Sequence, residues 1–145
     1  MRRVSLVLVS LLTAACATAR PHPPIGVMWG YLGTAANLPG VEILGYAPDR
    51  PSCEFMRAMA QTRSGVPVPS QVSAQCQELA VLPYRDGADP IYWVFTLTEG
   101  DVEQFAAGGN DRDFCTNFRQ ETLKVFLRRR DSLTECEPVI VKRVM

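Results

Sequence analysis

Short segments rich in β-branched and aromatic residues recur along the chain, and four of them predict strands. These segments cover residues 41–46, 78–84, 91–98 and 138–144. Each has the length of an ordinary strand and lies next to turn-forming residues. The apolar stretch at residues 25–32 is a candidate for an additional N-terminal strand.

Two other segments carry apolar residues at helical spacing. Residues 52–63 and 113–129 predict helices, since their cysteine, methionine and phenylalanine residues recur every three or four positions, as on a core-facing stripe. Short polar side chains that can accept the free amides of a first helical turn are available at both starts. The candidate caps are Asp49 or Ser52 for the first helix and Asp111 or Asp113 for the second.

The two helical segments begin with similar sequences. Residues 49–57 read DRPSCEFMR and residues 111–119 read DRDFCTNFR. The similarity continues past a second cysteine, because Val81 and Val141 each follow it by five positions. Self-similarity of this kind is a fold signature. It predicts two duplicated β-α-β units, at about residues 40–84 and 91–145.

The resulting element order is β-α-β-β-α-β, which is the order of a ferredoxin-like sandwich. We therefore expect an α+β fold in which an antiparallel sheet carries both helices on one face. Residues 25–145 have the size and apolar content of a single domain, the whole chain being 145 residues long and 47% hydrophobic. Residues 99–110 have no counterpart in the first unit, and we expect a short helix at residues 102–107.

Four cysteines belong to this domain, and they predict two disulfides. They are Cys53, Cys76, Cys115 and Cys136. Zinc is disfavoured because no two of them lie two to four residues apart. In a true ferredoxin-like sheet each helix would separate the cysteines of its own unit, so that the bonds would join the units. If the second strand of each unit is reversed, the bonds close within the units. The similar spacing of the cysteines in both copies favours this sequential pairing.

The N-terminus has the order of a secretory signal. Arg2 and Arg3 precede an apolar run at residues 4–12, which gives way to small residues before Cys16. The sequence Leu12-Thr13-Ala14-Ala15-Cys16 resembles the lipobox of bacterial lipoproteins, although Thr13 occupies the place where leucine is usual. The resemblance implies a signal peptide at residues 1–15 and a lipidated Cys16. The alternative is cleavage after Ala17-Thr18-Ala19, which would release a soluble periplasmic or secreted protein.

Residues 16–24 suit a tether between a lipid anchor and the domain. Prolines 21, 23 and 24 favour an extended chain, and His22, the only histidine, lies among them. The resemblance to lipoproteins implies a protein of the cell envelope. Ala17 is not the aspartate that signals retention in the inner membrane, so the resemblance points to the outer membrane, with the domain facing the periplasm.

Charge and motifs exclude several classes of function. The formal net charge is +0, without the basic excess that binding to nucleic acid requires. No phosphate loop, dinucleotide fingerprint or nucleophile elbow occurs, and the lone histidine precludes a catalytic triad within the domain. We expect a non-catalytic domain without a cofactor or bound metal. The repeated arginines at 50, 57, 112 and 119 are expected to form structural ion pairs with Asp49 and Asp111.

Aromatic residues provide the one indication of an interaction surface. It comprises Tyr84, Tyr92, Trp93 and Phe95. Alternation places Trp93 and Phe95 on one face of their strand and Tyr92 on the other. One face must meet the helices, and an open second face would bind a partner. We therefore expect a membrane-tethered envelope domain that binds or braces another envelope protein. The alternative is a soluble periplasmic or secreted domain that binds a small ligand or acts as an inhibitor.

Overall fold

The computed structural model describes residues 23–35, 38–62, 69–72, 75–99, 103–125 and 133–144. Within them lie seven strands and two helices. In chain order they are β1 (Gly26–Ala35), β2 (Glu42–Ala47), α1 (Arg50–Thr62), β3 (Pro69–Val72), β4 (Gln77–Pro83), β5 (Ile91–Glu99), β6 (Glu103–Gly109), α2 (Arg112–Val125) and β7 (Glu137–Arg143).

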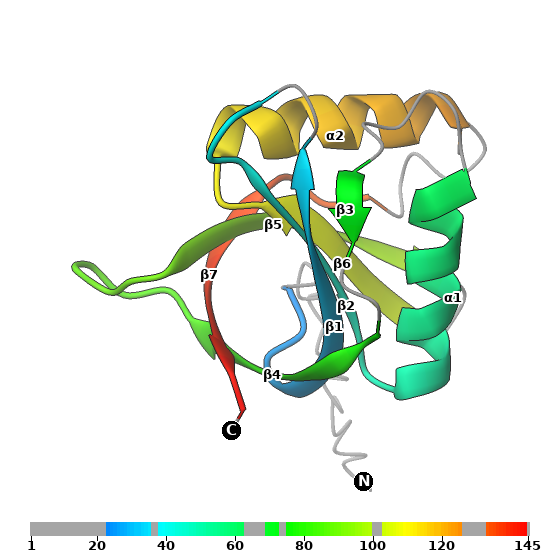
Figure 1. Ribbon diagram of the computed structural model, residues 1–145. Helices are drawn as coiled ribbons and strands as arrows, with labels where there is room; N and C mark the ends of the chain where they lie inside the picture. The colour runs from blue at the N-terminus through cyan, green and yellow to red at the C-terminus, as the bar shows by residue number, and fades with distance from the viewer. Residues whose placement is uncertain are drawn as a thin grey trace, which may run out of the picture.

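Six of the strands form a closed antiparallel barrel, which Figure 1 views along its axis. The strands follow the order β2-β6-β5-β7-β4-β1, and β1 pairs with β2 to complete the ring. The short β3 lies beside the end of β1. The expected open ferredoxin-like sheet is therefore wrong. The candidate strand at residues 25–32 is present as β1, and it closes the sheet by pairing with β2 on one edge and β4 on the other.

The expected short helix at residues 102–107 is also wrong, because residues 103–107 lie in β6. Its sequence, EQFAAGG, has low β propensity. Small residues are nevertheless required there. A Cβ at Gly108 would lie 1.9 Å from the carbonyl oxygen of Trp93 on the neighbouring β5. Packing between the strands thus overrides local propensity, and β6 joins β2 to β5.

Both expected helices form, and both begin at an aspartate cap. The amide of Ser52 donates to Asp49 Oδ1 at 2.8 Å, and the amide of Phe114 donates to Asp111 Oδ1 at 2.8 Å. The first helix is described as far as Thr62, and its expected last residue, 63, lies outside the described residues. The second is described as far as Val125, and the expected end near residue 129 lies outside the described residues.

The disulfides pair sequentially, as the cysteine spacing predicted. Cys53 bonds to Cys76 and Cys115 bonds to Cys136, each with 6.2 Å between the Cα atoms. Each bond joins the first turn of a helix to the residue that precedes a barrel strand, β4 for Cys76 and β7 for Cys136. The strand reversal expected to accompany this pairing is wrong, because β2 and β4 both run antiparallel to β1 and are therefore parallel to each other. Gly30 lies opposite both Tyr46, near the end of β2, and Gln77, at the start of β4, and this stagger brings Cys76 to the start of α1. Stagger of this kind also allows a sheet to close into a barrel.

The two halves of the barrel share one pattern of pairing. The order β1-β2-α1-β4 in the first half matches β5-β6-α2-β7 in the second. Trp29 lies opposite Ala47 in the first hairpin, and Trp93 lies opposite Gly109 in the second. The repeated unit thus includes a hairpin before its helix. The segment at residues 99–110 is not an insertion, because β6 is the counterpart of β2.

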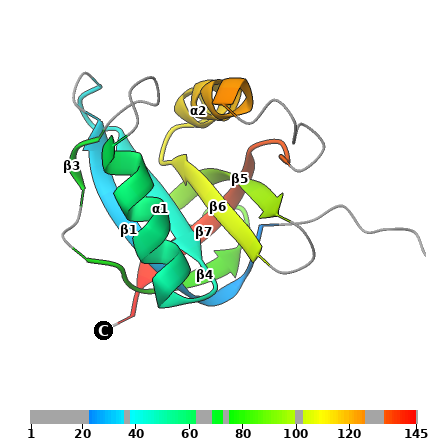
Figure 2. The ribbon, with the colours of Figure 1, turned by 90° about the vertical axis from the view of Figure 1, so that its right-hand side faces the viewer.

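Apolar side chains form one cluster inside the barrel and two outside it. The interior cluster includes Leu44, Tyr46, Leu79 and Val94, all fully buried. One outer cluster lies beneath α1, around the disulfide of Cys53, and the other lies beneath α2. Figure 2 shows the helices on the outer surface, α1 along β1 and β2 and α2 over β5 and β6.

The repeated arginines do not pair with the capping aspartates as expected. Arg50 lies over the ring of Trp29 at 5.4 Å from its centroid, and Arg112 lies over Trp93 at 5.0 Å. These cation–π contacts are equivalent in the two halves.

The second repeated arginine of each half also has a different partner. Arg57 pairs with Glu54 at 2.8 Å. Arg119 donates to the carbonyl oxygen of Thr134 at 2.5 Å and pairs with Glu135 at 3.3 Å. The aspartates are engaged by helix amides instead, which explains why these ion pairs do not form.

Candidate functional site

The two ends of the barrel differ. At one end, the interior hydroxyl of Tyr46 donates to the carbonyl oxygen of Pro24 at 3.2 Å. The neighbouring Pro23 is buried, so residues 23–25 cover this end of the barrel. In Figure 2 these residues (blue) lie to the right of the barrel, whereas the C-terminal end of β7 (red) lies to its left. The Pro24 end is thus the closed end.

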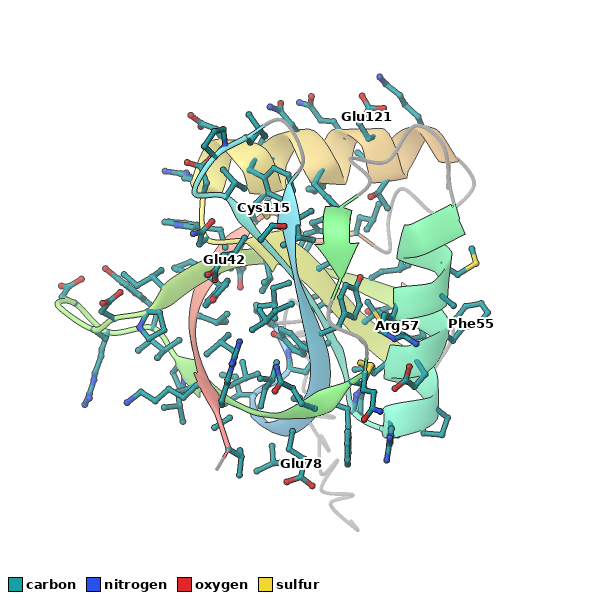
Figure 3. The ribbon with its side chains drawn as sticks, viewed as in Figure 1. Glu42, Phe55, Arg57, Glu78, Cys115 and Glu121 are labelled. Atoms are coloured by element: carbon teal, nitrogen blue, oxygen red, sulfur yellow. A yellow bond between two sulfur atoms is a disulfide. The ribbon has the colours of Figure 1, made fainter. Side chains whose placement is uncertain are left out.

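At the opposite end the interior positions change from apolar to polar. Side chains alternate between the inside and outside of a barrel strand. Leu32, Leu44 and Val141 belong to the interior cluster, and the next interior positions toward this end are Thr34, Glu42 and Arg143. All three of these polar residues are exposed. Three different strands therefore supply polar residues to one rim, and Figure 3 shows Glu42 at the edge of the barrel opening.

This rim surrounds an open hollow of about 800 Å³. We call it the rim hollow. Its apolar floor includes Leu32, Leu79 and Val141, and its polar edge includes Thr34, Glu42, Lys142 and Arg143. An apolar floor with a few convergent polar groups is the usual composition of a small-molecule site.

Glu42 and Tyr92 form a short hydrogen bond at the edge of the rim hollow. The hydroxyl of Tyr92 donates to Glu42 Oε2 at 2.5 Å. Burial, followed by this hydrogen bond, raises the pKa of Tyr92 well above its ordinary value, and so the hydroxyl remains a donor. The backbone of Glu42 is held by Asn110, whose Oδ1 accepts the Glu42 amide at 2.8 Å. The position of the carboxylate is therefore fixed by both its side chain and its backbone.

Two cationic residues, Lys142 and Arg143, line the edge of the rim hollow. Neither Lys142 nor Arg143 makes an ion pair with any residue in the part of the chain that the structure describes. The charge of Arg143 acts on Tyr92 by lowering its pKa, against the larger effect of burial. The edge thus offers two free cationic groups and an engaged carboxylate. Among the described residues, no group of three His, Cys, Asp or Glu side chains could hold a metal ion.

The aromatic residues expected to form an interaction surface do not lie together. Tyr92 is 6% exposed and faces the barrel interior. Trp93 and Phe95 belong to the outer cluster beneath α2. Tyr84 is exposed on the loop after β4, where its hydroxyl donates to Asp86 at 3.0 Å. Tyr92 alone of the four contributes to the rim hollow, and the expected lipidation site, Cys16, lies outside the described residues.

The polar residues of the rim were not identified from the sequence. The available signal was that the alternating apolar pattern ends on a charged residue, as in Val139, Val141 and Arg143. The pattern indicates a polar rim only if the ends of β1, β2, β5 and β7 are known to meet. The predicted open sheet did not bring these ends together.

Within the described part of the chain, no helix is long and apolar enough to cross a membrane. Comparison with known proteins found no family model, no curated protein and no solved structure that matches this chain.

Proposed function

We propose that this chain is a membrane-tethered lipoprotein of the cell envelope, and that its barrel is a non-catalytic domain that binds a small ligand in the rim hollow. The observation that carries the proposal is the opposite placement of tether and hollow. Pro24, where the predicted tether joins the domain, contacts Tyr46 at the closed end. Glu42, at the rim, begins the strand in which Tyr46 is the penultimate residue.

The length of β2 separates the tether junction at Pro24 from the rim hollow. Four residues of a strand span about 13 Å, so Glu42 and Tyr46 lie at opposite ends of this short barrel. A lipid anchor at Cys16 would hold the closed end toward the membrane. The rim hollow would then open toward the periplasm, where a ligand can reach it.

The chemistry of the rim hollow favours a small amphipathic anion. Leu32, Leu79 and Val141 would contact an apolar portion of the ligand. Arg143, at an interior position of β7, would pair with an anionic group, because its guanidinium matches a carboxylate or phosphate with two parallel hydrogen bonds. Lys142 would add positive charge at the edge of the rim hollow. The hydrogen bond from Tyr92 engages the carboxylate of Glu42, so that the guanidinium of Arg143 stays available to the ligand.

The tether is tested by labelling cells with a radioactive fatty acid. The wild-type protein should carry the label and fractionate with the outer membrane, whereas Cys16→Ser should carry no label. An unlabelled wild-type protein with a mature N-terminus at Arg20 would support the alternative, a soluble ligand-binding domain.

The rim hollow is tested with decanoate as an anionic probe and decanol as its neutral counterpart. We expect decanoate to shift the NMR signals of residues 34, 42, 92 and 143 and to bind more tightly than decanol. Arg143→Gln should weaken decanoate binding by about 10-fold or more, because a hydrogen bond to a charged group contributes about 1.5–3 kcal/mol. Arg85→Gln, an exposed cation outside the rim hollow, is the control. Equal loss in both variants, or shifts elsewhere, would contradict the proposed site.

A further inference from the structure

One side of the barrel carries no helix. The helices pack against β1 and β2 and against β5 and β6, and Figure 1 shows that the side formed by β4 and β7 lacks a helical cover. Exposed aliphatic side chains gather where β1 begins and β4 ends. They are Ile25, 47% exposed, Val27, 63% exposed, and Leu82, 39% exposed. We call these three residues the aliphatic patch.

The pairing of β1 with β4 holds the aliphatic patch together. Val27 lies opposite Ala80, and Gly26 lies opposite Val81. Because alternate residues of a strand share a face, Val27 and Ile25 on one strand adjoin Ala80 and Leu82 on the other. Their exposure shows that this shared face points outward. The patch therefore belongs to a rigid strand pair.

The aliphatic patch lies where the predicted tether enters the domain. Residues 23–25 cover the closed end, and Ile25 is itself a member of the patch. The seven residue steps from Cys16 to Pro23 span at most about 25 Å when fully extended. A lipid on Cys16 would thus keep this end of the barrel within a short reach of the bilayer.

We infer that the aliphatic patch rests on the membrane surface and fixes the orientation of the tethered barrel. The inference builds on the proposed function, since it takes Cys16 as the anchor. The occupant is a lipid surface because the chain leads from the patch to the anchor. Charges of both signs flank the aliphatic patch on the outward face, Glu78 on β4 and Lys142 opposite Ala80 on β7. The contact is therefore apolar rather than electrostatic and should form on neutral lipid.

The two tryptophans provide matched reporters of orientation. Trp29 follows Val27 on the same face of β1 and lies opposite Ala47, at the end of β2 that carries Tyr46. Trp93 lies opposite Gly109, which pairs with Ile43 near the rim. Each ring lies beneath an arginine, Arg50 or Arg112, so their surroundings are similar. The tryptophans differ in which end of the barrel they occupy.

The experiment couples the thiol of residue 16 in the purified chain, starting at that cysteine, to a maleimide phospholipid in phosphatidylcholine vesicles. This coupling does not depend on lipidation in the cell, so a failure here is distinguishable from a failure of the proposed anchor. Brominated phosphatidylcholine then quenches tryptophan near the bilayer. Trp93→Phe leaves Trp29 as the only emitter, and Trp29→Phe leaves Trp93. We expect Trp29 to be quenched at least two-fold more than Trp93, with little effect of salt.

Substitutions in the aliphatic patch complete the test. In the Trp93→Phe background, Val27→Ser with Leu82→Ser should abolish the preferential quenching of Trp29. Phe55→Ser is the matched control, because Phe55 is also 63% exposed and points away from the barrel on α1 in Figure 3. Val27→Ser alone should reduce the quenching in part.

Equal quenching of both tryptophans, or quenching that survives the double substitution, would overturn the inference. So would a dimer in sedimentation that Val27→Ser dissociates, since a second copy would then occupy the patch.

Discussion

Val81 and Val141 lie opposite each other across β4 and β7, both inside the barrel. They are also equivalent positions, each five residues after the second cysteine of its half. A local twofold axis therefore passes between them, and the equivalent positions Gly45 and Ala107 pair in the same way on the opposite side. Such an axis exchanges the two ends of the barrel. The differences between the closed end and the rim must then come from residues in which the halves differ.

Tyr46 shows how the halves have diverged. It lies opposite Ala106, and Leu44 lies opposite Gly108, so each large interior residue of β2 faces a small one of β6. A six-stranded barrel has little interior space. A second large residue at the β6 positions would compete with Tyr46, whose hydroxyl holds Pro24. The asymmetry of the interior is thus linked to the closure of one end.

The first prediction concerns Arg119. Its guanidinium bonds to the carbonyl oxygens of Thr134 and Leu133, beside the disulfide of Cys136. Arg119→Ala should lower the free energy of unfolding by about 1–3 kcal/mol, because these carbonyl groups would lose their donors. Arg57→Ala is the matched control from the first half. It breaks a bond to the side chain of Glu54 alone and should cost at most about 1 kcal/mol. Urea unfolding of both variants provides the measurement, and equal losses would contradict the prediction.

The second prediction concerns the dependence of stability on pH. The amide of Cys76, and then the side chain of Arg57, donate hydrogen bonds to Glu54 and hold its pKa below the ordinary value. A carboxyl group whose pKa is lower in the folded state stabilises the fold above its unfolded pKa. This stabilisation is lost as the pH falls through the folded pKa.

Glu54→Gln should therefore flatten the decline in unfolding free energy between neutral and acidic pH. Urea unfolding at a series of pH values measures this decline. Glu121→Gln is the control, because it removes a carboxylate whose hydrogen bond is to the exposed side chain of Lys124 and not to a backbone amide. A Glu54→Gln profile that parallels the wild type would show that the Cys76 bond does not depend on charge.

The sequence predicted the parts of this fold that depend on local chemistry. Residues within one half determine each helix start, at Asp49 or Asp111, and each sequential disulfide. The repeated sequence determines the equivalence of Val81 with Val141. Closure of the barrel cannot be predicted from such local features. It depends on β6, whose Ala-Ala-Gly-Gly sequence is selected by the close approach of β5 rather than by β propensity. The rim hollow escaped prediction for the same reason, because it joins the ends of strands that are distant in sequence.

The third prediction tests the close approach at Gly108. A Cβ at this position would meet the backbone of Trp93, which cannot move without disturbing the sheet. Gly108→Ala should lower the free energy of unfolding by about 1–3 kcal/mol through overpacking. Gly30→Ala is the comparison, since its Cβ would lie 2.3 Å from the end of the Leu79 side chain and no closer than 3.0 Å to backbone, at the Gly45 carbonyl oxygen. The end of a side chain can shift more readily than the backbone of a paired strand. A smaller effect at Gly108 than at Gly30 in thermal melts would argue against backbone contact as the reason for glycine.

The last prediction separates the role of Tyr92 in the rim hollow from its role in the core. Tyr92→Phe keeps the buried ring but removes the hydroxyl that binds Glu42 at 2.5 Å. The carboxylate would then be free to turn toward Arg143 and compete with an anionic ligand for its charge. We therefore expect Tyr92→Phe to lower the free energy of unfolding by only about 1 kcal/mol and to weaken decanoate binding several-fold. Adding Glu42→Gln should restore binding, because the competing charge is gone. If the double variant binds decanoate no better than Tyr92→Phe alone, then Tyr92 does not act through Glu42.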